Sequence, residues 1–346
     1  MFIAAATVTV AAHGAPVLSL ESLTVEFATE RGVVRALEDV SFAIEASESV
    51  ALVGESGSGK SVTSLSVLRL LAPSGRIAAG RVLFRGWNGE AVDLARADAA
   101  TLRAVRGAGV SMIFQEPMSA LNPAFTVGAQ IAETIELHQR TSRAEALGRA
   151  EALLAKVGIA EPARRLGQHP HQLSGGMRQR VMIAMAVACR PALLIADEPT
   201  TALDVTTQAR VLELLRALQA ETSMGVLFIT HNLALVPMIA SRVLVMYAGQ
   251  IVEAGGAAQV LAAPKHPYTR ALLECLPARH LPRHRTAWRP LPTIEGAASN
   301  LVDRPAGCAF ASRCPIAERA CTVEAIRLRP VGDDGRLSRC LRAESL

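Results

Sequence analysis

The sequence lacks any uninterrupted hydrophobic run long enough to cross a membrane. Beyond the first dozen residues the longest such run is VMIAMAVAC, Val181–Cys189, about half the length that a membrane-spanning helix needs. The mildly apolar residues 1–14 lack the basic segment that opens a secretory signal, and strand-like sequence follows them directly. We therefore expect a short N-terminal extension, residues 1–16, on a protein that stays in the cytoplasm.

Lysine is absent from the C-terminal stretch Arg279–Leu346, and aromatic residues are few there. This stretch holds 12 arginines against seven acidic residues, a net charge of +5 that equals the charge of the whole chain. The body is therefore neutral and the tail is basic. A basic tail can bind nucleic acid or anionic lipid. Because no recognisable nucleic-acid module accompanies it, we expect no nucleic-acid partner.

The chain is nevertheless well supplied with hydrophobic residues, which make up half of its 346 positions. That composition can bury a large core, and the length suggests about two domains. No internal repeat is visible. The sequence thus predicts an ordinary globular protein of the α/β class, for the reasons that follow.

The order of apolar runs predicts two kinds of sheet. Residues 17–44 alternate between apolar and polar side chains, as antiparallel strands of a small sheet do. After them, short buried-strand runs alternate with helical segments, which indicates a mainly parallel α/β core. These runs are Ser49–Val53, Val110–Phe114, Ala192–Ala196 and Gly225–Thr230, with a closing hairpin at Arg242–Gly255. Residues 126–167 are rich in Ala, Glu, Leu and Arg and predict a helical insertion.

The segment GESGSGKS fits the G-x-x-x-x-G-K-[ST] pattern of a phosphate-binding loop, between a predicted strand and a predicted helix over Val62–Leu71. Glycines let backbone N–H groups turn toward phosphates, a lysine adds a mobile cation, and a serine hydroxyl can bind Mg²⁺. The predicted nucleotide-binding residues here are Gly54, Glu55, Ser56, Gly57, Ser58, Gly59, Lys60, Ser61 and Val62.

Two carboxylates follow the strand ALLIA, at the carboxyl end where α/β folds bind ligands. We expect Asp197 to hold Mg²⁺, directly or through water, as Ser61 does. We expect Glu198 to polarise the attacking water. The alternative is that the two carboxylates only begin a helix, where the helix dipole favours negative charge. The phosphate-loop pattern in the same chain favours the catalytic interpretation.

A second glycine-bearing stretch, LSGGM at Leu173–Met177, precedes a helix that we expect to run from Met177. With the segments DEPTTALD, IFQEP and FITHNL, it resembles the ATPase subunits of ABC transporters over roughly residues 18–255. In that family two ATPase domains face each other head to tail, and the signature of one completes the ATP site of the other. The resemblance thus implies that Ser174, Gly175 and Gly176 bind the γ-phosphate of a partner's ATP, as a helix N-terminus can.

The same resemblance implies further roles. Gln115 matches a glutamine that contacts Mg²⁺ and couples the site to transport, and His231 matches a histidine at the γ-phosphate. Asp204 ends the segment that follows the catalytic acid, and Phe27 sits where the family stacks an aromatic ring on adenine. Each residue has a plainer alternative, since Gln115 can simply end a strand, His231 can cap a helix and Phe27 can belong to the core.

The C-terminal tail indicates a particular group within the ABC transporter family. HPYTRALLECLP, His266–Pro277, and GCAFASRCPIAERAC resemble ATP-binding subunits of oligopeptide and dipeptide importers, and nickel importers share parts of this pattern. The resemblance implies a mixed-sheet ATPase domain over residues 17–263, with an antiparallel β subdomain and a helical subdomain at about 126–180. A small irregular domain with four cysteines follows over 264–346.

The implied assembly contains a second ATPase subunit, two transmembrane permeases and an extracytoplasmic solute-binding protein. Within it, this chain would hydrolyse ATP at the cytoplasmic face of the membrane to import peptides, with nickel or another small solute as alternatives. A soluble ABC ATPase acting on ribosomes or DNA usually has two ATPase domains or a long coiled coil, and neither appears here. Intact Lys60, Asp197, Glu198 and His231 argue against a non-hydrolysing subunit.

Four of the six cysteines lie in the tail: Cys308, Cys314, Cys321 and Cys340. Their spacing matches neither the paired cysteines of structural zinc sites nor the bacterial ferredoxin run. The family resemblance implies a [4Fe–4S] cluster, whose negative charge would suit nearby arginines. From the residues alone, Zn²⁺ and free thiols remain open.

Overall fold

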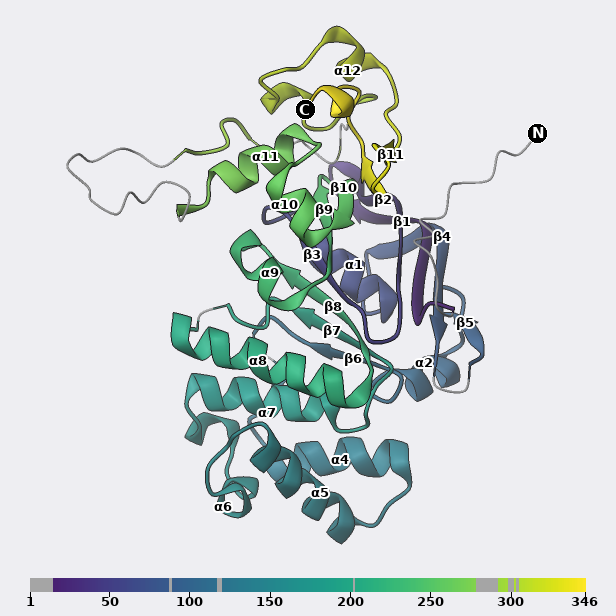
Figure 1. The fold of residues 1–346 in the computed structure, drawn as a ribbon. Helices are drawn as coiled ribbons and strands as arrows, with labels where there is room; N and C mark the ends of the chain where they lie inside the picture. The colour runs from purple at the N-terminus through teal and green to yellow at the C-terminus, as the bar shows by residue number, and fades with distance from the viewer. Residues whose placement is uncertain are drawn as a thin grey trace, which may run out of the picture.

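The computed structural model describes residues 15–86, 89–116, 120–201, 203–277, 292–297, 302 and 305–346. Residues 1–14 of the expected N-terminal extension lie outside these ranges. Two β-sheets occupy the middle of the molecule, with the helices α4–α6 at one end and the C-terminal tail at the other (Figure 1). In the described ranges, no helix is both long enough and apolar enough to cross a membrane.

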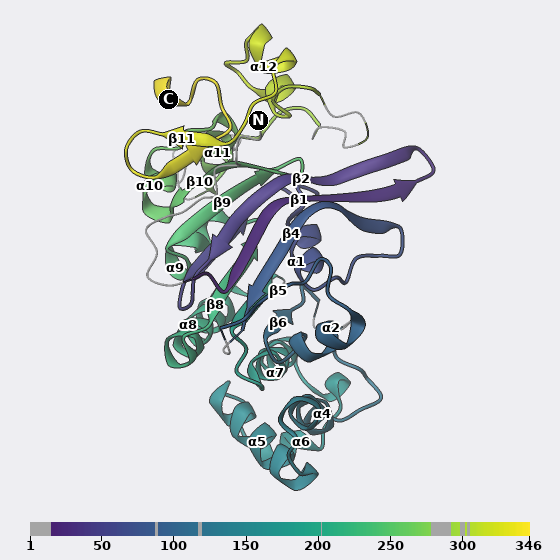
Figure 2. The same cartoon turned by 90° about the vertical axis from the view of Figure 1, so that its right-hand side faces the viewer.

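The smaller sheet is antiparallel and has the strand order β2-β1-β4-β5. Its strands are β1 (Leu18–Thr29), β2 (Gly32–Ile44), β4 (Gly75–Arg85) and β5 (Ala91–Asp93). Figure 2 shows β1, β2 and β4 as long neighbouring strands. The prediction of antiparallel strands over residues 17–44 is confirmed, whereas β4 and β5 were not expected.

The larger sheet has eight strands in the order β11-β12-β10-β9-β3-β8-β7-β6. The parallel core consists of β3 (Ser49–Val53), β6 (Val110–Ile113), β7 (Leu193–Asp197) and β8 (Gly225–Thr230). Their residues are almost all buried, because helices and the smaller sheet cover both faces. The predicted hairpin is formed by β9 (Arg242–Tyr247) and β10 (Gln250–Gly256). The α/β prediction is thus confirmed.

Alternate residues of the core strands point into different hydrophobic clusters. On β7, Leu194 and Ala196 join the cluster that includes α7 (Gly175–Val187) and α8 (Val205–Thr222). Leu193 and Ile195 join the cluster that includes α1 (Lys60–Val67), α2 (Ala99–Val105) and the smaller sheet. The helices that follow the two glycine-bearing stretches therefore lie on opposite faces of the larger sheet.

The expected insertion is helical and packs on the α7 side of the core. It contains α4 (Val127–Gln139), α5 (Arg143–Lys156), α6 (Pro162–Leu166) and the short 3-10 turn η1 (Pro170–Gln172). Thr126 and Ser142 cap α4 and α5 by accepting backbone N–H groups, which explains where these helices begin.

Two helix boundaries differ from the prediction. The helix after the phosphate loop begins at Lys60 and ends at Val67, because Arg69 has a φ angle of 49°, a left-handed conformation that does not continue a helix. The second helix begins at Gly175 rather than Met177, because the Ser174 side chain accepts the Met177 N–H and so fixes the N-cap.

The tail is built from short elements, yet it is joined to the larger sheet, because β12 pairs with β10. After β8, the remaining elements are η2 (Leu233–Leu235), α9 (Val236–Ile239), α10 (Ala257–Ala262), α11 (Pro267–Glu274), η4 (Ala311–Arg313), α12 (Arg319–Val323), β11 (Arg329–Val331), β12 (Arg336–Ser338) and η5 (Ala343–Ser345). The boundary near residue 263 stays a prediction, since the sheet runs across it.

Glu253 on β10 is fully buried beside this junction. One carboxylate oxygen accepts the Lys265 N–H at 2.6 Å. Burial raises the pKa of Glu253 to about 7, although the Thr269 hydroxyl, the backbone N–H groups of residues 265 and 266, and the Arg336 cation favour the charged form. In the unfolded chain the pKa of this glutamate is 4.5. Between pH 4.5 and about 7, the folded protein therefore keeps a proton on Glu253 that the unfolded chain has lost.

We accordingly expect the free energy of unfolding to fall as the pH rises from about 4.5 through about 7, since the stabilising protonated form is lost over that interval. The contribution of this group is at most about 3 kcal/mol. Glu253→Gln should remove this pH dependence and make the protein more stable than the wild type at pH 8. Urea unfolding at pH 5 and pH 8 measures both effects, with the exposed Glu324→Gln as control. Equal pH dependence in wild type and Glu253→Gln would contradict the expectation.

Candidate functional site

The phosphate-loop pattern forms a turn between β3 and α1, as predicted. Gly54, Gly57 and Gly59 have φ angles of 158°, 77° and 108°, which residues with a Cβ rarely adopt. At Gly54 there is also no space, because a Cβ would lie 2.2 Å from the Met246 carbonyl oxygen. Along the loop, Ser56 and Ser61 are exposed, Ser58 is buried and Val62 is partly buried.

Lys60 lies at the first position of α1, with 5% of its surface exposed. Its ammonium group donates hydrogen bonds to the carbonyl oxygens of Gly54, at 2.8 Å, and Glu55, at 2.9 Å. Burial lowers its pKa, an effect that the nearby carboxylates of Glu198 and Asp197 oppose. The loop therefore holds a cation at a helix N-terminus, an arrangement that suits phosphate groups.

Asp197 is the last residue of β7 and is 4% exposed. One of its oxygens lies 3.5 Å from the Ser64 hydroxyl, and the other is buried without a hydrogen-bond partner. Burial raises the pKa of Asp197, while the Ser61 hydroxyl opposes the change. A carboxylate oxygen without a partner beside a hydroxyl provides the oxygen ligands that Mg²⁺ prefers. Asp197 and Ser61 therefore fit the predicted magnesium site.

Glu198 is the centre of a group of polar side chains. One of its oxygens accepts hydrogen bonds from Gln115 at 3.2 Å and Thr201 at 2.8 Å, and it lies 3.0 Å from Nδ1 of His231. Burial raises the pKa of Glu198, but the contacts with His231 and Thr201 outweigh burial and lower it. The carboxylate is therefore ionised, as a general base must be.

The structure thus brings together the three predicted catalytic residues, Gln115, Glu198 and His231, from three different strand ends. Thr201 was not predicted. Its position three residues after Glu198 in DEPTT is the only sequence signal that could have suggested it. Glu198 also has a φ angle of 47°, an unusual conformation for a residue with a side chain. Such strain is often found where a side chain must point into a site.

The signature stretch lies apart from this group, at the start of α7. Ser174 caps α7, and a Cβ at Gly175 would meet nothing within 4 Å. Asp204 caps α8 by accepting the N–H groups of residues 206 and 207 at 3.0 Å. A Cβ at Gly176 would lie 3.5 Å from the Thr207 methyl group, so the starts of α7 and α8 are close together.

Phe27 lies on β1, where its ring is partly buried and packs on Gly75 of β4. This is the position of a sheet residue that belongs partly to the core. Contact with adenine therefore stays a prediction for Phe27.

Comparison with known proteins decides the family. The family model described as ABC transporter matches residues 37–201, and the model described as the C-terminal region of oligopeptide and dipeptide transporters matches residues 252–321. A putative peptide import ATP-binding protein of Brucella abortus is 50% identical over 336 residues, covering 96% of this chain and 98% of that protein. This chain belongs to the ABC transporter family.

Further relatives of this ABC ATPase agree. The dipeptide transport ATP-binding protein DppD of Escherichia coli is 48% identical over 93% of this chain and 95% of its own length. Among solved structures, a dimeric ATP-binding cassette in a post-hydrolysis state with bound ADP and Pi has a TM-score of 0.61 and 27% identity. It covers 69% of this chain and 98% of its own. The chain is therefore an ATP-hydrolysing enzyme with the ABC fold.

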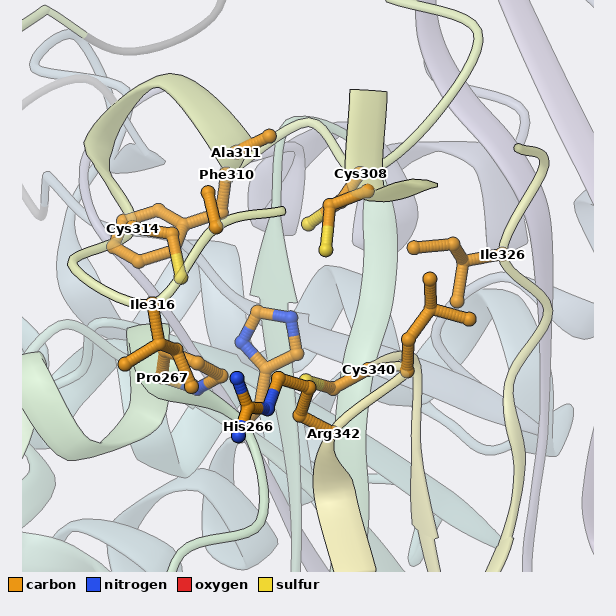
Figure 3. Close-up of a pocket in the computed structure, with 13 residues that line it drawn as sticks. His266, Pro267, Cys308, Phe310, Ala311, Cys314, Ile316, Ile326, Cys340 and Arg342 are labelled. Atoms are coloured by element: carbon orange, nitrogen blue, oxygen red, sulfur yellow. The ribbon is translucent and has the colours of Figure 1, made fainter. Parts of the chain in front are cut away.

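The four tail cysteines of the ABC ATPase line one cavity, together with His266 (Figure 3). Among the described residues, no three His, Cys, Asp or Glu side chains are grouped closely enough to hold a single metal ion. Burial raises the pKa of Cys308 to about 11. Cys189 and Cys275 lie elsewhere and are partly buried free thiols.

His266 is almost fully buried, and burial lowers its pKa to about 3, so the imidazole is neutral. Its Nδ1 accepts the Tyr268 N–H at 3.1 Å. The proton must therefore be on Nε2, which is buried, and a backbone hydrogen bond with Arg339 partly offsets the effect of burial on the pKa of His266. The cavity is thus lined by four cysteines and one neutral imidazole.

Proposed function

We propose that this chain is one of two ATPase subunits that drive peptide import through two transmembrane permeases at the cytoplasmic face of the membrane. A solute-binding protein outside the cytoplasm would deliver the peptide. The observation that carries the proposal is the C-terminal segment 252–321, which matches the tail of oligopeptide and dipeptide transporters in addition to the ATPase domain. The relatives that share the whole chain length are peptide and dipeptide import proteins by name.

In this function different residues of the site bind ATP, hold Mg²⁺ and activate water. The loop N–H groups and Lys60 bind the phosphates, and Asp197 and Ser61 hold Mg²⁺, which supplies the charge that neutralises the phosphate oxygens. Glu198 accepts the proton of the attacking water, since its carboxylate is ionised and held in place by Thr201. His231 and Gln115 contact the same carboxylate and align it.

The signature residues Ser174, Gly175 and Gly176 serve the nucleotide of the partner ATPase in this proposal. The support comes from their attachment to α7, which packs on the face of the larger sheet opposite to α1. A helix N-terminus presented away from the chain's own phosphate loop is suited to a phosphate on a second subunit. ATP would then join two subunits, and hydrolysis would release them.

An apolar groove supports a permease as partner. Its lining includes Leu70, Phe114 and Leu121, together with Met182 and Met185 of α7. Leu70 and Phe114 are 39% and 37% exposed, so the groove presents apolar surface to the solvent. Phe114 directly precedes Gln115, so a helix bound in the groove would contact the neighbour of the residue that contacts Glu198. We infer that a short permease helix binds here.

We further propose that the four tail cysteines hold a [4Fe–4S] cluster. In such a cluster each thiolate binds a different iron, so its ligands lie farther apart than those of one ion. Four cysteines line one cavity, and four is the number of thiolates that such a cluster needs. Zn²⁺ and free thiols are the alternatives.

Replacing one cysteine tests this assignment. Anaerobically purified Cys314→Ser should contain much less iron and acid-labile sulfide than the wild type and should melt at a lower temperature, because a bound cluster stabilises the folded tail. Cys275→Ser, outside the cavity, is the matched control. Wild-type protein with zinc or no metal, or an unchanged melting curve of Cys314→Ser in iron-loaded protein, would exclude the proposed role.

Co-purification tests the transporter assignment. The tagged chain would be purified anaerobically from detergent-solubilised membranes, and the proteins that accompany it identified by mass spectrometry. We expect two permeases and a second ATPase, and the solute-binding protein of that system can then be tested for peptide or nickel binding. If the chain purifies alone or with ribosomes, that result would contradict the assignment to an importer.

A further inference from the structure

The tail reaches the phosphate loop and holds Glu55, its second residue. Arg313 forms a two-point contact with the Glu55 carboxylate, with Nη1 at 2.9 Å from one oxygen and Nη2 at 3.1 Å from the other. The two residues are 258 positions apart in the sequence. Planar contacts of this kind are both strong and directional.

The backbone of Glu55 is held as well. Its N–H donates to the Tyr268 hydroxyl at 2.8 Å, and its carbonyl oxygen accepts from the Lys60 ammonium group at 2.9 Å. Tyr268, like Arg313, lies beyond residue 263. The tail therefore holds the side chain and the N–H of the same residue whose carbonyl contacts the phosphate-binding lysine.

Arg313 is itself firmly placed, with 4% of its side chain exposed. Its remaining donors bind the Tyr247 hydroxyl and the carbonyl oxygens of Ile294 and Glu295, so every N–H group of the guanidinium has an acceptor. The guanidinium also lies 5.8 Å from the ring centres of Tyr247 and Phe310.

A cluster of three buried aromatic rings supports this contact. Tyr247 of β9 lies 4.6 Å from the Tyr268 ring and 5.3 Å from Phe310, measured between ring centres. Tyr268 and Phe310 are also 5.3 Å apart. The rings thus connect the larger sheet, α11 and the turn η4 that carries Arg313, and a rigid support of this kind can fix a loop position.

We propose that Arg313 is a positioning residue for the phosphate loop, through which the tail sets the affinity of this chain for ATP. The inference rests on the proposed binding of ATP at the loop. It adds a second determinant of the affinity for ATP, one that lies in the tail. With Arg313 in place, the Glu55 N–H and the Lys60 contact are fixed before ATP arrives. Preorganisation of this kind strengthens binding because the loop loses less conformational freedom when the ligand binds.

The test measures ATP hydrolysis by the purified transporter complex, with binding of a fluorescent ATP analogue to the full chain as a second readout. In Arg313→Met we expect KM for ATP to rise about tenfold while kcat changes less than about twofold, the pattern of a lost binding contribution. Arg313→Lys should be intermediate, because lysine keeps the charge but not the two-point contact. The matched control is Arg336→Met, a tail arginine that does not contact Glu55; its side chain is 12% exposed and binds the Ala263 carbonyl and Asp334.

Tyr268→Phe provides an independent variant, since it keeps the buried ring and removes only the acceptor for the Glu55 N–H. It should raise KM for ATP about threefold with little change in the melting temperature. This variant decides the question if Arg313→Met does not fold. Unchanged KM in folded Arg313→Met or Tyr268→Phe, whatever their melting temperatures, would overturn the proposal and leave Arg313 a structural brace. Wild-type chain that does not bind ATP would instead refute ATP binding at the loop.

Discussion

Glu198→Gln should lower the kcat of ATP hydrolysis at least about 100-fold, because a positioned general base contributes roughly that much or more. The amide keeps an oxygen that can accept from Thr201 but cannot take a proton from water. Binding of ATP should remain, because Lys60, Asp197 and the loop N–H groups are unchanged. Steady-state hydrolysis and equilibrium binding of labelled ATP by the purified complex measure the two properties separately.

The matched control is Glu213→Gln on α8, an exposed glutamate outside the site, which should hydrolyse ATP at the wild-type rate. Dimer closure in ATP should persist in Glu198→Gln, since closure depends on bound nucleotide and not on its cleavage. Retention of full turnover in this variant would show that Glu198 is not the base.

The second large effect concerns Gly54. In Gly54→Ala the new methyl carbon would lie 2.2 Å from the Met246 carbonyl oxygen and 2.8 Å from the Ser58 hydroxyl, so the loop or β9 must move. We expect a loss of roughly 3 kcal/mol or more in the free energy of unfolding, in the range of overpacked or strained sites. For a chain of this size that corresponds to a fall of about 4 °C in melting temperature.

Gly57→Ala is the control for Gly54→Ala, because Gly57 also has positive φ, of 77°, but a Cβ there would meet nothing within 4 Å. It should cost only about 1 kcal/mol, the price of the conformation alone. Thermal melting without nucleotide compares the two variants. An equal loss of stability in both would mean that contact with β9 does not explain the requirement for glycine at position 54.

Much of the core could be predicted because strands buried on both faces leave short apolar runs, and β3 and β8 coincide with the predicted ranges. The loop and the paired carboxylates follow local patterns that fix their place at strand ends. In contrast, β4 has arginines and glycines between its apolar residues, and most of its first half is at least partly exposed. It forms a strand because β1 offers it a partner, which its own sequence does not reveal.

The unpredicted parts of the site depend on contacts between distant segments. The contact of Arg313 with Glu55 joins the tail to the loop, and the tautomer of His266 depends on the Tyr268 backbone. Thr201 is closer in sequence, but its contact with Glu198 arises only because the chain turns after β7. Residue patterns identify groups that can react, whereas the fold decides which of them are held still.

The pairing of β12 with β10 has a consequence for the solubility of the protein. Without the tail, β10 would be the edge of the larger sheet, and its free N–H and C=O groups could pair with strands of other molecules. The tail instead places at that edge the three-residue strand β11, which contains Pro330 and begins with Arg329. Short strands, proline and positive charge all discourage edge-to-edge association. The segment that carries the cysteines thus also protects the ATPase core from aggregation.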